Sequence, residues 1–282
     1  MVAIPLTLAI VLAGGPALAG LLAVASAIAA WEFFRMARLA GHAPLGDVGC
    51  ALAGLIPLAV FAVYLGLLEP RFSYLSVVLI LLFSASIWTR GTSGGPMGAV
   101  ATTVLGVLYT GGLLSFGYAL RYHDYAVGAV KVGPFQIAAG GVLLGLPLVL
   151  TWATDIGAFF VGRTVGGRKL IPAVSPGKTV SGAIGGVVVS VLVAWVYVTY
   201  ALKPAAQLAL SPAGMVMFGV TISIAAQLGD LVESLLKREA GVKDSSQLLP
   251  GHGGVLDRLD SLFFVLPTAQ LLLGWLLIPA PR

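Results

Sequence analysis

The residues best able to do chemistry are gathered between positions 234 and 260. This stretch reads Ser-Leu-Leu-Lys-Arg-Glu-Ala-Gly-Val-Lys-Asp-Ser-Ser-Gln-Leu-Leu-Pro-Gly-His-Gly-Gly-Val-Leu-Asp-Arg-Leu-Asp, within a chain of which only 10% is charged. A charge in or beside a bilayer costs about 2.5–3.5 kcal/mol on insertion scales. A dense cluster of both signs therefore indicates a polar site with a function.

Two pairs of carboxylates have the spacing that places both members on one helix face. Asp257 and Asp260 are three residues apart, as are Asp230 and Glu233, and such residues are neighbours on a helix. The two pairs lie on adjacent predicted spans and could meet near the cytoplasmic surface as an oxygen-rich site of the kind that Mg²⁺ prefers, because this ion takes a few carboxylates, waters and substrate phosphates. The alternative is that these acids only solvate a helix end and favour its dipole. Glu233 could also simply pair with Lys237.

A glycine-rich turn precedes the last carboxylate pair. His252-Gly253-Gly254 follows Pro250-Gly251, and exposed glycine amides at the start of a helix can approach a phosphate closely. His252 could orient a phosphate or donate a proton, or it could be a local hydrogen bonder. The basic residues around the turn strengthen the phosphate interpretation; they are Lys237, Arg238, Lys243 and Arg258.

A second polar cluster lies between residues 155 and 179. Asp155 is about two turns inside the end of an apolar segment, so it is either a paired structural acid or part of the site. The basic residues that follow it could be plain membrane anchors; they are Arg163, Arg168, Lys169 and Lys178. Pro176-Gly177-Lys178-Thr179 lacks the first glycine of a P-loop and the preceding strand, so it is not a Walker motif.

Composition identifies the chain as an integral membrane protein. Hydrophobic residues make up 59% of it and the mean hydropathy is +1.01. Its continuous apolar runs predict an all-α, polytopic fold rather than a β-barrel. The net charge of +5 is explained by orientation and anionic lipid, so we expect no nucleic-acid partner. The single cysteine, Cys50, excludes an intrachain disulfide.

About nine transmembrane helices are predicted. They lie near residues 2–15, 16–34, 48–68, 72–89, 98–120, 135–161, 179–201, 212–236 and 259–279. The first is short and broken by Gly14-Gly15-Pro16, so a hairpin that only partly crosses is an alternative. Ala17-Leu18-Ala19 resembles a signal-peptidase site, but a basic n-region is missing, and we expect an uncleaved first span.

The distribution of charge orients these spans and divides the chain. If all nine cross, 11 of the 16 basic residues fall on one side, which the positive-inside rule places in the cytoplasm, with an external C-terminus. Four acidic residues precede residue 150 and seven follow it. We therefore expect a transmembrane scaffold over residues 1–134 and a catalytic region with cytoplasmic loops over 135–282.

The 234–260 segment resembles the signature of the phosphatidate cytidylyltransferase, or CDP-diacylglycerol synthase, family. The positions that carry the resemblance are Ser234-x-Leu236-Lys237-Arg238, Lys243-Asp244-x-Ser246 and Leu249-Pro250-x-His252-Gly253-Gly254-Val255-x-Asp257-Arg258-Leu259-Asp260. Gln227-Leu228-Gly229-Asp230 and Ser175-Pro176-x-Lys178-Thr179 also look like family motifs. The chain departs from the pattern at Ile156 and Ser181.

The resemblance implies transfer of CMP from CTP to phosphatidate, giving CDP-diacylglycerol and pyrophosphate. It implies Mg²⁺ as cofactor, with a second cation allowed, and a possible homodimer. It also implies a multi-pass protein of the inner (plasma) membrane whose active site faces the cytoplasm. The residues it makes catalytic are Asp230, Lys237, His252, Asp257, Arg258 and Asp260, with the three aspartates as metal ligands. The residues it assigns to substrate are Asp155, Ser175, Lys178, Arg238, Lys243, Asp244, Gly253 and Gly254.

Three other functions are compatible with the sequence. A CTP-dependent lipid kinase and a CDP-archaeol-type synthase could use a related metal site. An ion-coupled transporter also places carboxylates in helices and breaks spans with Gly and Pro. The gathering of the charges at one end of the spans, with no sign of a repeated half, favours the enzyme.

Overall fold

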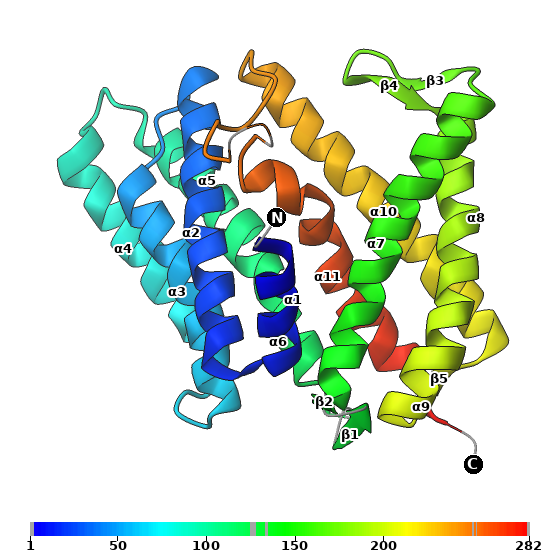
Figure 1. The fold of residues 1–282 in the computed structure, drawn as a ribbon. Helices are drawn as coiled ribbons and strands as arrows, with labels where there is room; N and C mark the ends of the chain where they lie inside the picture. Colours follow the sequence, from blue (N-terminus) through cyan, green and yellow to red (C-terminus); the bar gives the residue numbers. More distant parts are fainter. Residues whose placement is uncertain (1–2, 125–127, 133–134, 250, 252, 281–282) are drawn as a thin grey trace. The chain divides into compact units, whose positions relative to one another are not determined.

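The described part of the chain folds mainly into apolar helices, with three two-stranded antiparallel sheets (Figure 1). The computed structural model describes residues 3–124, 128–132, 135–249, 251 and 253–280. Its α-helices are α1 (Ala3–Ala13), α2 (Gly15–Leu39), α3 (Gly46–Tyr64), α4 (Ser73–Arg90), α5 (Pro96–Val107), α6 (Leu113–Arg121), α7 (Ala139–Thr164), α8 (Val180–Tyr197), α9 (Lys203–Ala206), α10 (Pro212–Glu239) and α11 (Leu256–Leu276). Two π-helical segments, η1 (Leu108–Gly112) and η2 (Val198–Leu202), continue α5 into α6 and α8 into α9.

The strands pair as antiparallel neighbours. They are β1 (Ala129–Val132) with β2 (Phe135–Ala138), β3 (Lys169–Ile171) with β4 (Ser175–Thr179), and β5 (Leu208–Leu210) with β6 (Leu277–Pro279). None of these strands was predicted from the sequence.

The expectation of an all-α polytopic membrane protein is confirmed. Within the described residues, eight helices are long and apolar enough to cross a bilayer, counting α5 to α6 and α8 to α9 as one each. The first predicted span corresponds to α1, which has 11 residues, short of the roughly 20 that a crossing needs. The chain breaks after it at Gly14, where φ is +71°. This segment therefore holds one helix long enough to cross, α2, and a short helix before it, rather than two full spans.

The chain divides into two compact units. Unit 1 comprises residues 1–18, 116–235 and 260–282, and unit 2 comprises residues 19–115 and 236–259. Both α10 and α11 contribute residues to each unit. The division at residue 134 was drawn from the distribution of charge and stays a prediction about where the functional residues lie.

In unit 1, α7 and α8 pack through small residues. A Cβ added at Gly185 would lie 2.5 Å from Val161, and one at Gly182 would lie 2.7 Å from the carbonyl oxygen of Ala158. Such glycines let two membrane helices approach closely. The hydroxyl of Tyr197 also donates to the carbonyl of Val142 at 2.7 Å. This packed pair carries the β3–β4 hairpin at one end.

In unit 2, Phe34 of α2 fills the space between neighbouring helices. It is fully buried, and an added Cβ at either Gly49 of α3 or Gly106 of α5 would lie 2.4 Å from its ring. Side chains in close-packed interiors leave no room for an extra methyl group. The ring therefore fixes α2 against α3 and α5, and with it the neighbouring residue Glu32.

Candidate functional site

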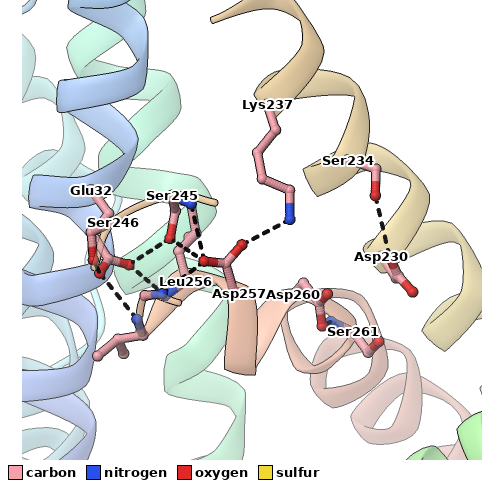
Figure 2. A network of polar contacts seen from close by, with 12 residues as sticks. Glu32, Asp230, Ser234, Lys237, Ser245, Ser246, Leu256, Asp257, Asp260 and Ser261 are labelled. Carbon is pink, nitrogen blue, oxygen red and sulfur yellow. Dashed lines mark hydrogen bonds and ion pairs between the residues drawn. The ribbon is translucent and has the colours of Figure 1, made fainter. Parts of the chain in front are cut away.

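Asp257 is the centre of a polar cluster in unit 2. Its Oδ1 contacts Nζ of Lys237 at 2.7 Å. Its Oδ2 accepts hydrogen bonds from the backbone N–H of Gly254 at 2.7 Å and from the N–H and hydroxyl of Ser245 at 3.0 and 2.8 Å (Figure 2). Asp257 is 9% exposed. A buried carboxylate with a cationic partner and several donors is a stable arrangement, because its charge is compensated.

The loop between α10 and α11 is shaped by its glycines. Gly253 has φ of +77°, and an added Cβ there would lie 2.7 Å from Oδ2 of Asp257. At Gly254 an added Cβ would lie 2.1 Å from the hydroxyl of Ser245 and 2.4 Å from Oε1 of Glu32. Both positions thus require glycine for packing, and the amide of Gly254 is already used by Asp257. A role of these two glycines in phosphate contact stays a prediction.

Sequence reasoning gave Glu32 no role, yet its carboxylate is the other acceptor of this cluster. Glu32 is fully buried in α2. It accepts hydrogen bonds from the hydroxyls of Ser245 and Ser246 at 3.2 and 2.5 Å, and from the backbone N–H groups of Val255 and Leu256 at 3.0 and 2.6 Å. One signal in the sequence was an acidic residue within an apolar helix, which is rare without a function or a partner.

Other predicted residues of unit 2 lie on its surface. Arg238, Lys243, Asp244 and Arg258 are exposed, within reach of a solvent-borne anion. His252, predicted to be catalytic, lies outside the described residues.

Asp230 and Lys178 are brought together in unit 1. Oδ2 of Asp230 lies 2.6 Å from Nζ of Lys178, and its Oδ1 accepts a hydrogen bond from the hydroxyl of Ser234 at 3.3 Å. Asp155 of α7 is close enough to interact electrostatically with both Asp230 and Lys178. Two clusters that are separate in sequence, around residues 155–178 and at 230, therefore meet in space. Ser175, also predicted, is half-buried at the start of β4.

Asp260 lies at a close approach of α10 and α11 within unit 1. A Cβ added at Gly229 would lie 2.6 Å from the carbonyl oxygen of Asp260 and 2.9 Å from Cα of Ser261. Oδ1 of Asp260 accepts a hydrogen bond from the N–H of Ser261 at 2.6 Å. Because Asp230 directly follows Gly229, this close approach brings the segments that carry Asp230 and Asp260 beside each other. Glu233, one turn further along α10, is fully buried.

Across the described residues, no group of three or more His, Cys, Asp or Glu side chains is arranged to hold a metal ion. The magnesium site expected at Asp230, Asp257 and Asp260 therefore stays a prediction. What the structure does contain is a carboxylate–lysine pair in each unit, Asp230 with Lys178 and Asp257 with Lys237.

The two departures from the family pattern have local explanations. Ile156 is an exposed apolar residue on α7, as expected of a membrane helix. The hydroxyl of Ser181 donates to the carbonyl of Gly166 and lies 3.1 Å from Oγ1 of Thr179, which caps α8 by accepting from the N–H of Gly182. Ser181 therefore helps to fix the β3–β4 hairpin to the start of α8.

The fold and these clusters define a multi-pass helical membrane protein with a carboxylate–lysine pair in each unit. A sequence profile of the Cytidylyltransferase family matches residues 1–276. The chain belongs to this family, and the resemblance found in its sequence is confirmed.

Relatives with curated names agree with the family. The chain is 47% identical over 126 residues to the phosphatidate cytidylyltransferase of Bacillus subtilis and 46% identical over 128 residues to that of Haemophilus influenzae. Each of these two matches covers 45% of this chain. They cover 45% of the Bacillus subtilis protein and 44% of the Haemophilus influenzae protein, which is less than half of either relative. The match to the phosphatidate cytidylyltransferase of Synechocystis is longer, at 32% identity over 95% of this chain and 92% of the relative.

Proposed function

We propose that this protein transfers a cytidylyl group from CTP to phosphatidate, releasing pyrophosphate and forming CDP-diacylglycerol. The observation that carries the proposal is the family match over residues 1–276, together with relatives named phosphatidate cytidylyltransferase. The family's polar motifs in this chain form ordered clusters rather than loose loops, which supports the same assignment.

The carboxylates suit a hard divalent cation by their chemistry. Asp230 and Asp260 are both half-buried and lie next to the close approach of α10 and α11 at Gly229. Asp257 presents Oδ1 to a cation, at present the ammonium of Lys237, while its Oδ2 is engaged by the loop. We infer that Asp230, Asp257 and Asp260 would hold Mg²⁺, with a second cation allowed. When bound, the ion would neutralise charge that builds up on the phosphates during transfer.

The bond changes of the reaction are simple. An oxygen of the lipid phosphate forms a bond to the α-phosphorus of CTP, and the bond from that phosphorus to the bridging oxygen breaks, so pyrophosphate leaves with the electron pair. The attacking phosphate is already anionic, so no general base is assigned. Catalysis then consists mainly of positioning and electrostatic stabilisation.

The basic residues of the chain would do this positioning. Arg238, Lys243 and Arg258 are exposed within the 236–259 segment of unit 2, where they can bind the triphosphate or the lipid phosphate as charge-assisted donors. Lys178 and Lys237 already contact carboxylates, so each can shift between a carboxylate and a phosphate oxygen. Asp155, Ser175 and Asp244 are retained as predicted contacts to substrate, and His252 as a predicted catalytic residue.

The location follows from the spans and the charge bias. We propose an inner (plasma) membrane protein with these basic loops in the cytoplasm, where CTP is available, as the positive-inside rule favours. In intact cells, a membrane-impermeant cysteine reagent should therefore label an engineered Arg71→Cys but not an engineered Lys243→Cys. Labelling at both positions, or only at Lys243→Cys, would contradict this orientation. A homodimer stays a prediction.

The reaction is tested by following two labels from CTP. Purified protein in phosphatidate vesicles with Mg²⁺ should transfer label from the α-phosphate into the lipid phase, and label from the γ-phosphate should appear only in aqueous pyrophosphate. Transfer of the γ-label to lipid would instead identify a CTP-dependent kinase. Transfer of the α-label only to an isoprenoid ether lipid would identify a CDP-archaeol-type synthase, and ion flux without CTP would identify a transporter.

A further inference from the structure

We propose that Glu32, in the N-terminal half of the chain, is a positioning residue for the Asp257 carboxylate. The inference rests on the proposed function for its catalytic consequence, although the geometry that supports it does not. Glu32 lies on α2, and its partners are 213 to 224 residues away in sequence. All of these residues belong to unit 2.

Glu32 caps the helix that carries Asp257. The N–H groups of Val255 and Leu256 lie at the start of α11, where the first amides of a helix have no partner within it. The carboxylate of Glu32 accepts from both, at 3.0 and 2.6 Å, and a negative charge at this end also favours the helix dipole. The first turn of α11 is therefore held by a side chain of α2, and Asp257 is the second residue of that turn.

Ser245 links the two carboxylates directly. Its hydroxyl lies 2.8 Å from Oδ2 of Asp257 and 3.2 Å from Oε2 of Glu32. A hydroxyl has a single proton to donate, so the two carboxylates share the proton of Ser245, with the shorter contact to Asp257. Arg35, one turn after Glu32 on α2, donates to the carbonyl of Ser245 at 2.9 Å. Helix α2 thus holds this serine from two sides.

The consequence for Asp257 is a fixed orientation. Its Oδ2 accepts from Ser245 and Gly254, both of which contact or pack against Glu32, so Oδ1 is directed away from α2 and toward Lys237 (Figure 2). A carboxylate held in this way is ready to bind a cation without reordering. Loss of such an outer contact typically lowers metal affinity on the order of 10- to 100-fold.

Glu32→Gln is the most conservative test. It keeps the shape of the side chain but replaces one acceptor oxygen by a donor NH₂, which would face the N–H groups or hydroxyls that Glu32 now accepts from. Two serine variants separate positioning from general loop stability. Ser245→Ala removes the hydroxyl shared with Asp257, whereas Ser246→Ala removes a contact to Glu32 and one to the N–H of Leu248 but none to Asp257.

Two readouts do not depend on turnover. Mn²⁺ binding to the purified full chain is measured by electron paramagnetic resonance, and hydrogen exchange by mass spectrometry reports on peptides covering residues 244–259. Melting temperature identifies a variant that fails to fold, in which case Ser245→Ala carries the test. Glu69→Gln, which alters an exposed acid paired with Arg71, is the matched control.

We expect Glu32→Gln to weaken Mn²⁺ binding on the order of 10- to 100-fold and Ser245→Ala about tenfold, with faster exchange at the start of α11. Ser246→Ala should leave Mn²⁺ affinity unchanged, as should Glu69→Gln. Equal weakening by both serine variants, or unchanged Mn²⁺ affinity in a folded Glu32→Gln, would overturn the inference. Failure of the wild-type protein to form CDP-lipid would instead reject the proposed function, whatever the Mn²⁺ result.

Discussion

Nζ of Lys178 lies 2.6 Å from Oδ2 of Asp230, so strand β4 is joined by an ion pair to helix α10. The two residues come from motifs that are 52 positions apart in sequence, and Asp155 of α7 lies within electrostatic reach of both. The β3–β4 hairpin therefore belongs to a polar site rather than serving only as a membrane anchor.

Lys178→Met should weaken CTP binding while leaving the fold intact. The substitution keeps an unbranched side chain but removes a cation from the proposed phosphate clamp. A hydrogen bond to a charged group is worth about 1.5–3 kcal/mol, so KM for CTP should rise about tenfold or more. Lys203→Met, at an exposed lysine of α9, should not change KM. An unchanged KM in Lys178→Met would exclude Lys178 from the clamp.

Asp257→Asn should abolish nucleotidyl transfer without preventing membrane insertion. The amide removes the charge that faces Lys237 and places a donor near groups that now donate to Oδ2. Breaking a buried ion pair costs about 3–5 kcal/mol, so the melting temperature should also fall. Activity is measured with α-labelled CTP and insertion by membrane fractionation. Wild-type turnover in the inserted variant would rule out a catalytic role.

Gly254→Ala should destabilise the loop that holds Asp257. The new methyl group would lie 2.1 Å from the Ser245 hydroxyl and 2.4 Å from Oε1 of Glu32, and overpacking of this kind costs about 1–3 kcal/mol. Gly20→Ala in α2, where an added Cβ meets nothing within 4 Å, is the matched control. Thermal unfolding should show a lower melting temperature only for Gly254→Ala; equal stability of the two variants would contradict the packing described for the loop.

Gly229→Ala should separate α10 from α11 in unit 1. Its methyl group would lie 2.6 Å from the carbonyl oxygen of Asp260, so the backbones must move apart. We expect weaker Mn²⁺ binding, by about tenfold, measured by calorimetry on purified protein. Gly274→Ala, which is also helical and meets nothing within 4 Å, should bind as the wild type does. Identical affinities would mean that this close approach does not shape the metal site.

Much of the fold was predictable because apolar runs near 20 residues have few alternatives to spanning helices. The predicted span at 212–236 corresponds to α10 (Pro212–Glu239), and that at 259–279 to α11 (Leu256–Leu276). The N-terminal segment was harder to predict. The break at Gly14 is visible in the sequence, but the length of the apolar segment before it did not decide whether that segment crosses the membrane. The short strands were missed because three to five residues give too little periodicity to recognise.

The sequence also located the polar clusters but not their partners. Glu32 contacts residues more than 200 positions away, and no local spacing predicts such a pair. Arg121 directly follows the predicted span at 98–120, where a loop was expected. It is instead 5% exposed and donates to the carbonyls of Val11 and Leu12 at the end of α1. Long-range capping of helix ends by charged side chains accounts for both cases.

The central claim is that Asp230, Asp257 and Asp260 bind one divalent cation between nucleotide and lipid headgroup. The most direct test is a crystal structure with Mn²⁺ and a non-hydrolysable CTP analogue, in which anomalous scattering locates the metal. We predict a Mn²⁺ peak with carboxylate oxygens of these three residues within about 2.0–2.6 Å, the range of hard cations with oxygen ligands, and a phosphate oxygen on its open side. A Mn²⁺ peak away from these carboxylates, or three carboxylates too far apart to share one ion, would contradict a metal site formed by Asp230, Asp257 and Asp260.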